Sequence, residues 1–208
     1  MQRDHSSLNH PIVEQSFAII DREVGKHSLS PAEYAIARRV IHSTADFEYL
    51  NLLEFRHNAI DSALVALQNQ IPIVTDVTMV KQGIKTLVSK VFNNPIISAI
   101  DFAETARSGM TRTETGLLEC WKQYPQAIYV IGNAPTALLA LCDCIEQQED
   151  ETHPPLVIGA PVGFVSVIEA KASLRTLNIP QILVHGRKGG SPVAAAIINS
   201  LLILAAQN

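Results

Sequence analysis

Apolar residues in the first third of the chain recur at intervals of three and four, which is the spacing of an amphipathic helix. One such stretch begins after His10 and is predicted to end near Val24, because Gly25 favours a helix stop. A second stretch begins at Ser30, and a third spans residues 60–70. We therefore expect three helices before residue 71, with a mixed segment between the second and the third.

From residue 71 onward the pattern changes to short apolar runs rich in β-branched residues, each followed by a helical pattern. Runs of this kind are typical of strands that are buried on both faces of a parallel sheet. The alternation predicts right-handed crossovers and an α/β fold with three layers, α/β/α, around a mainly parallel five-stranded sheet. The five predicted strands are residues 71–77, 95–101, 127–132, 155–160 and 181–186.

The pattern gives no sign of a second domain. Its only break is the acidic segment 146–154, which lacks core residues and is predicted to be a surface loop. The chain has 208 residues, of which 47% are apolar and 17% are charged, enough for a well-buried core. Residues 1–208 are therefore expected to form a single domain.

Charge and cysteine content narrow the classes of function. A net charge of −4 gives no indication of a nucleic-acid-binding surface. The three cysteines lack zinc-ligand spacing and are interpreted as free thiols in a reducing compartment. No apolar run reaches the roughly 20 residues that span a bilayer, and the polar N-terminus lacks the core of a secretion signal. We therefore expect a cytoplasmic protein with no metal site and no membrane contact.

Three loops that follow predicted strands are rich in glycine. Because the carboxyl ends of parallel strands meet at one edge of a sheet, these loops should lie together where ligands bind. Glycine lets the backbone approach a ligand, and free N–H groups at a helix start favour anions. The glycines could instead serve only tight turns, but three such loops, one of them cationic, favour an anionic ligand. The candidate binding residues are Gly132, Asn133, Gly163, Arg187, Gly189 and Gly190.

The second predicted helix carries a candidate acid–base group. Residues three and four apart share a helix face, so Arg38 or Arg39 should line one side with His42, followed by Asp46 if the helix continues that far. The helix start is well marked, because Ser30 and Glu33 match a capping box. An imidazole between guanidinium and carboxylate groups is a tunable acid or base. The alternative interpretation is a solvated face, which is where most charged residues lie.

Other polar positions carry weaker signals. Asp76 and Thr78 leave the first strand and are more simply helix caps than ligand groups. Arg112 lies at a predicted helix start, where a cation opposes the helix dipole, and this local conflict indicates a ligand contact. Ser16 lies on an apolar helix face, where a hydroxyl most often bonds back to its own helix.

Several blocks of sequence stand out together and in order. They are His10-Pro11-Ile12, Arg39-Val40-Ile41-His42, Asp76-Val77-Thr78-Met79-Val80, Thr111-Arg112, Gly132-Asn133-Ala134-Pro135-Thr136, Pro161-Val162-Gly163-Phe164-Val165 and Gly186-Arg187-Lys188-Gly189-Gly190-Ser191. In combination they resemble the precorrin-8X methylmutase family, which includes the cobalt-precorrin-8 methylmutases of cobalamin synthesis. The resemblance covers nearly the whole chain.

The resemblance implies an isomerase that moves a methyl group from C-11 to C-12 of a contracted tetrapyrrole. The substrate would be precorrin-8X or cobalt-precorrin-8, and the product hydrogenobyrinate or cobyrinate. By the same resemblance His42 is the proton donor and acceptor, and Ser16, Arg39 and Arg112 lie in the substrate pocket. No cofactor is implied, because cobalt, where present, arrives inside the substrate.

The resemblance further implies a flavodoxin-like fold and a homodimer with the pocket near the subunit interface. We expect the apolar C-terminal helix, residues 192–206, to supply dimer surface. A competing hypothesis is a non-catalytic carrier of tetrapyrroles or other anionic ligands, which would use the arginines and glycine loops but would not need His42. A flavin-binding module is a weaker alternative, because a fold does not by itself give a function.

Overall fold

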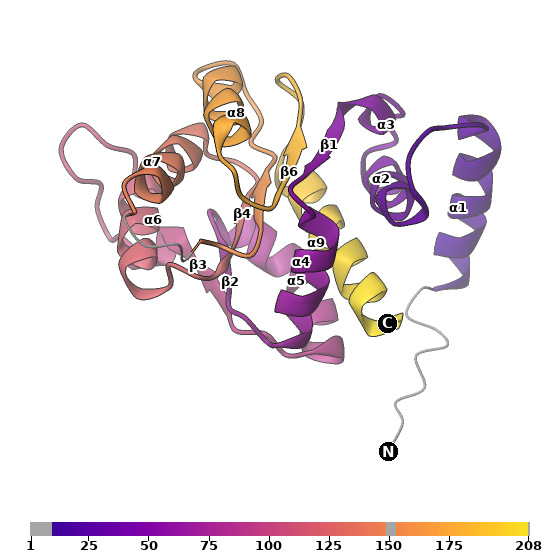
Figure 1. Ribbon diagram of the computed structural model, residues 1–208, viewed down its shortest axis with the longest axis horizontal. Helices are drawn as coiled ribbons and strands as arrows, with labels where there is room; N and C mark the ends of the chain where they lie inside the picture. The colour runs from indigo at the N-terminus through magenta and orange to yellow at the C-terminus, as the bar shows by residue number, and fades with distance from the viewer. Residues whose placement is uncertain (1–9, 149–152, 208) are drawn as a thin grey trace.

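The computed structural model, which describes residues 10–148 and 153–207, forms a six-stranded sheet with helices on both faces (Figure 1). The strand order is β1-β6-β5-β4-β2-β3. Neighbouring strands from β6 to β3 are parallel, and β1 runs antiparallel to β6. The strands are β1 (Leu53–Arg56), β2 (Ile73–Thr75), β3 (Ile96–Ser98), β4 (Ile128–Ile131), β5 (Val157–Gly159) and β6 (Gln181–Val184).

The five predicted strands are confirmed as β2 to β6, but the prediction of a five-stranded sheet is wrong. Strand β1 adds a sixth at the edge, where Leu53 pairs with Val184 and Arg56 with Gln181. Its four residues, Leu-Glu-Phe-Arg, alternate apolar and charged, and only Leu53 is fully buried. A short edge strand with one polar face gives none of the continuous apolar signal that marks the central strands.

The three helices predicted before residue 71 are confirmed as α1, α2 and α4. The capping box of Ser30 and Glu33 is present at the start of α2. Gly25 ends α1 with a φ of 63°, a left-handed value that favours glycine. The helices are α1 (Pro11–Val24), α2 (Pro31–Thr44), α3 (Tyr49–Leu52), α4 (Ala59–Gln68), α5 (Thr78–Val91), α6 (Arg112–Gln123), α7 (Pro135–Glu146), α8 (Val167–Thr176) and α9 (Ser191–Gln207), with a 3₁₀ turn η1 (Ala99–Phe102).

Two apolar cores, one on each face of the sheet, establish the three layers. Alternate residues of β4 point to opposite faces: Ile128 belongs to the core beneath α1, α2, α4, α5 and α9, and Tyr129 to the core beneath α6, α7 and α8. Figure 1 shows the same division, with α6 and α7 on one side of the sheet and α2 and α9 on the other. Cys120 and Cys142 are buried in the second core, and all three cysteines are free thiols, as predicted.

The C-terminal helix α9 is part of the core, and the expectation that it supplies dimer surface is wrong. It packs against α2, α4 and α5, and most of its residues are buried within the domain. Its apolar sequence therefore reflects coverage of the sheet by a helix that is enclosed on nearly all sides. Within the described ranges, no helix is both long and apolar enough to cross a membrane.

The sheet has a switch point between β2 and β4, which lead to helices on opposite faces. From β2 the chain passes to α5, in the layer that contains α9, and from β4 to α7 in the other layer. In open α/β sheets, ligands usually bind outside the carboxyl ends of the strands at such a switch point. The glycine-rich loops after β4, β5 and β6 all lie at this edge.

Candidate active site

His42 is an exposed residue in the last turn of α2, beside an aromatic side chain from α1. Its ring meets the ring of Phe17 edge to face, with centroids 5.5 Å apart. The guanidinium carbons of Arg38 and Arg39 lie 4.3 Å and 5.4 Å from the centroid of the same ring. Phe17 therefore packs an accessible imidazole together with two guanidinium groups, of which Arg38 is paired with Asp21 at 2.9 Å.

Asp46 does not share this helix face. Helix α2 ends at Thr44 because Ala45 takes a left-handed conformation, with a φ of 55°. Beyond that break the carboxylate of Asp46 binds the ammonium of Lys188, which also lies 3.0 Å from Glu48. The hydrogen bond from Lys188 lowers the pKa of Asp46. The predicted alignment of Asp46 with His42 required a longer helix and is not observed.

Ser16 precedes Phe17 on α1 and Arg39 lies on α2, and the two side chains face different surroundings. The Ser16 hydroxyl donates to the carbonyl of Ile12 at 2.9 Å, which confirms the bond back to its own helix. Arg39 is half-buried at a cavity of about 340 Å³ between α2, α5 and α9, which Lys90 and Asn199 also line. Burial lowers the pKa of Arg39, and the nearby Arg38 lowers it further, while Glu14 opposes the shift.

The switch point is filled by the fully buried carboxylate of Asp76. It accepts backbone N–H groups from Val77 at 2.9 Å, Gly132 at 3.1 Å, Asn133 at 2.7 Å and Ala134 at 2.8 Å. Burial raises the pKa of Asp76 above its ordinary value, and the hydrogen bonds from these four donors offset only part of that shift. The interpretation of Asp76 as a cap of α5 is wrong, because no side chain caps that helix.

These bonds change the expected role of Gly132 and Asn133. Their N–H groups, predicted to be free for an anionic ligand, are already bound to Asp76. Gly132 is required for packing, since a Cβ there would lie 2.8 Å from Val80 and 2.9 Å from Ala194. The side chain of Asn133 is exposed at the same edge. Any contact of this loop with a ligand would therefore come from the Asn133 amide.

Arg112 is exposed at the first position of α6, on the β3 side of the sheet. Its guanidinium donates to the carbonyl of Ile100 at 3.3 Å and, among the described residues, makes no ion pair. Thr111 caps this helix and lies 2.9 Å, oxygen to oxygen, from Thr136 at the start of α7. The structure brings Arg112 to the carboxyl edge of the sheet, where α6 and α7 begin, and shows no contact between Arg112 and His42 among the described residues.

The loops after β5 and β6 are tied to each other. The N–H of Gly163 donates to Arg187, and the N–H of Gly190 donates to Ala160 at 2.8 Å. At Gly189, with a φ of 152°, a Cβ would lie 2.4 Å from the carbonyl oxygen of Ala160, so only glycine fits. The predicted residues Gly163, Arg187, Gly189 and Gly190 are therefore brought together.

Sequence reasoning missed Lys171, which supports this loop pair from α8. Its buried ammonium donates to the carbonyls of Gly186 at 2.8 Å and Lys188 at 2.7 Å. Burial lowers the pKa of Lys171 to about 8. The available signal was its place on the apolar face of α8, one turn before Leu174 and four residues after Val167.

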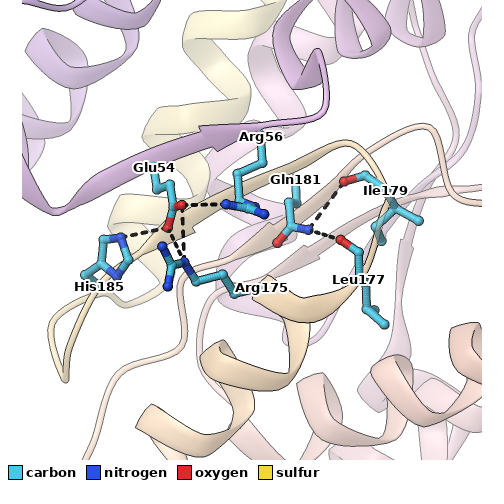
Figure 2. A network of polar contacts seen from close by, with 7 residues as sticks. All are labelled: Glu54, Arg56, Arg175, Leu177, Ile179, Gln181 and His185. Atoms are coloured by element: carbon cyan, nitrogen blue, oxygen red, sulfur yellow. Dashed lines mark hydrogen bonds and ion pairs between the residues drawn. The ribbon is translucent and has the colours of Figure 1, made fainter.

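A second polar network closes the β1–β6 edge (Figure 2). The carboxylate of Glu54 lies 3.0 Å from Arg56, 3.1 Å from Arg175 and 2.8 Å from Nε2 of His185. Burial raises the pKa of Glu54, but hydrogen bonds from Arg56 and Arg175 outweigh it and lower that pKa. His185, which directly follows β6, thus belongs to a network that joins β1, β6 and α8.

The chain is similar over nearly its whole length to known proteins. A family model described as precorrin-8X methylmutase matches residues 11–204. The cobalt-precorrin-8 methylmutase of Synechocystis sp. is 57% identical, with 95% of this chain and 97% of the relative covered. The precorrin-8X methylmutase of Sinorhizobium sp. is 32% identical over 95% of this chain and 96% of its own length. A crystal structure of precorrin-8X methyl mutase from Thermus thermophilus superposes with a TM-score of 0.85 at 39% identity, covering 95% of this chain and 98% of that chain.

Proposed function

The chain belongs to the precorrin-8X methylmutase family, and from this membership we propose that His42 is the acid–base group of its methyl shift. The protein is a methylmutase, an isomerase of cobalamin biosynthesis. The observation that carries the substrate assignment is the 57% identity with a cobalt-precorrin-8 methylmutase over 95% of the chain. Cobalt-precorrin-8 is therefore the expected substrate, and cobyrinate the product.

The reaction sets modest demands on the protein. The methyl group moves from C-11 to C-12 of one macrocycle, so substrate and product contain the same atoms and no group donor, oxidant or reductant is consumed. What remains is to hold the ring and to move a proton as the bonding of the ring changes. His42 suits the second task, because its imidazole is exposed and its ring is positioned by Phe17.

The anionic rim of the substrate fits the cations at this site. Arg39 and Arg112 are exposed or half-buried on separate elements, so they can take different carboxylates of one large ring. Ser16 directly precedes Phe17, which contacts His42, and its hydroxyl is bound to Ile12. The Asn133 amide and the loops of Gly163, Gly189 and Gly190 complete the proposed substrate edge.

The enzyme assignment is tested by turnover on both substrate forms side by side. Cobalt-precorrin-8 and precorrin-8X are incubated with the protein, and the change in absorbance that accompanies the methyl shift is followed. We expect conversion of the cobalt form at a rate far above that without protein. Tight binding of both forms without any conversion would instead support the competing hypothesis of a tetrapyrrole carrier.

Replacing Arg112 or Arg39 with Ala is expected to weaken tetrapyrrole binding by about 1.5–3 kcal/mol, the scale of a hydrogen bond to a charged group. Arg22→Ala removes an exposed guanidinium in the last turn of α1 and is the matched control. Binding is measured by titration of product and compared among the three variants. Equal affinity for wild type, Arg112→Ala and Arg39→Ala would place the substrate rim elsewhere.

We further propose that the protein is a homodimer with a flavodoxin-like fold, as the family resemblance implies. The parallel strands follow the flavodoxin order 2-1-3-4-5 when β2 to β6 are numbered from one. Sedimentation at micromolar concentration should then give a species near twice the chain mass of 22.7 kDa. A monomer under those conditions would exclude a pocket that is shared between subunits.

A further inference from the structure

The loop between β5 and α8 presents a large apolar surface at the ligand-binding edge. Phe164 is 86% exposed and Val165 is 81% exposed, which makes them the two most exposed large apolar side chains in the described part of the chain. Adjacent exposed apolar residues mark a surface that another molecule covers. Neither residue belongs to the set of site residues considered so far.

This surface stands on a fixed loop. The N–H of Gly163, next to Phe164, donates to the carbonyl of Arg187 in the β6–α9 loop. At the start of the β5–α8 loop, the carbonyl of Ala160 accepts a hydrogen bond from the N–H of Gly190 at 2.8 Å. The buried Lys171 in turn holds the carbonyls on both sides of Arg187. Hydrogen bonds therefore hold the backbone that leads into Phe164.

A cation stands at the edge of the apolar surface. The guanidinium carbon of Arg187 lies 6.0 Å from the ring centroid of Phe164, within the range of a cation–π contact. In the described ranges, this exposed guanidinium is near no carboxylate that could form an ion pair. An aromatic face with an unneutralised cation at its rim complements a flat apolar ring that carries carboxylates.

The β6–α9 loop, which holds the Phe164 loop, also contacts the segment that follows the His42 helix. Lys188, next to Arg187, binds Asp46, which lies four residues after His42. The Tyr49 hydroxyl reaches the carbonyl of Gly189 in the same loop at 3.5 Å. The β6–α9 loop thus connects the segment after α2 with the Phe164 loop.

We propose that Phe164 and Val165 form a platform for the macrocycle of the substrate, with Arg187 binding a carboxylate at its rim. The assignment rests on the proposed function, because it takes a contracted tetrapyrrole as the occupant. The ring lies against Phe164 and is held in register by Arg187, while His42 serves as the proposed acid–base group. Phe164 is then a substrate-positioning residue of the methylmutase.

The test measures binding and subunit mass in one experiment. Cobyrinate is mixed with wild-type protein, Phe164→Ala, Phe164→Leu or Val165→Ala, and sedimentation is followed at the visible absorbance of the corrin. Val65→Ala is the matched control, because Val65 is also an exposed valine, 57% exposed on α4 away from this edge. Turnover of cobalt-precorrin-8 is measured on the same samples.

We expect Phe164→Ala to bind cobyrinate about 10- to 100-fold more weakly, the scale for truncating an aromatic anchor. Phe164→Leu should lose less, because it keeps apolar bulk and lacks only the ring, and Val65→Ala should equal wild type. Wild-type turnover with unchanged cobyrinate affinity in Phe164→Ala would overturn the platform and leave the methylmutase function intact. Loss of the dimer in Phe164→Ala would assign the surface to a second copy of the chain, which also overturns it. A wild type that neither binds cobyrinate nor converts substrate would overturn both proposals.

Discussion

Replacing His42 with Ala is expected to slow conversion of bound substrate by a factor of roughly 10²–10⁴, the usual contribution of a positioned acid or base. The imidazole is exposed in the last turn of α2 and is the only histidine in the described ranges whose ring packs against Phe17. Ring binding should persist, because Arg39, Arg112 and the Phe164 loop are left in place. Single-turnover absorbance on saturated enzyme separates the two effects.

Two further variants give this experiment its controls. His42→Asn keeps much of the size and polarity of the side chain but removes the titrating group, so it should fail as Ala does. His27→Ala removes an exposed histidine that stacks on Tyr34 at 4.0 Å and should turn over as wild type does. If His42→Ala converts bound substrate at the wild-type rate, His42 is not the acid–base group and a carrier function gains support.

The layers of the fold followed from local sequence patterns, and the exceptions have local causes. Runs such as residues 127–132 are buried on both faces, and β-branched composition is enough to identify them. Strand β1 escaped because its pattern is short and half polar. The condition that α2 continue as far as Asp46 is not met, because Ala45 adopts a left-handed backbone that its residue type does not indicate.

The candidate site was less predictable, since its key contacts join distant parts of the chain. The bonds of Asp76 to Gly132, Asn133 and Ala134 span more than fifty residues, and no local spacing encodes them. Lys171 holds a loop that follows it by about fifteen residues and a full strand. Helix spacing and a helix-dipole conflict singled out His42, Arg39 and Arg112, and the family resemblance suggested their roles, whereas their neighbours became visible only in three dimensions.

Replacing Asp76 with Ala is expected to lower the free energy of unfolding by about 2–4 kcal/mol, because the substitution removes the buried acceptor of four backbone N–H groups. A water molecule entering the space could bond only some of these donors. For a chain of this size the loss corresponds to a fall in Tm of roughly 4–16 °C. Urea unfolding and calorimetry measure the two quantities.

The comparison that isolates the carboxylate uses Asp76→Asn and Asp101→Ala. Asn keeps the shape of Asp, but its amide nitrogen is a donor and would face backbone N–H groups that now donate to the Asp76 carboxylate. The Asp76→Asn substitution should therefore also destabilise the fold. Asp101 is an exposed partner of Lys81 at 3.9 Å, and its removal should cost at most about 1 kcal/mol, as for most surface ion pairs. Because Asp76 holds the backbone of Asn133 at the switch point, its loss should also weaken cobyrinate binding, whereas Asp101→Ala should leave it unchanged. Equal stability of the Asp76→Ala and wild-type proteins would mean that the β4–α7 loop keeps its conformation without this carboxylate.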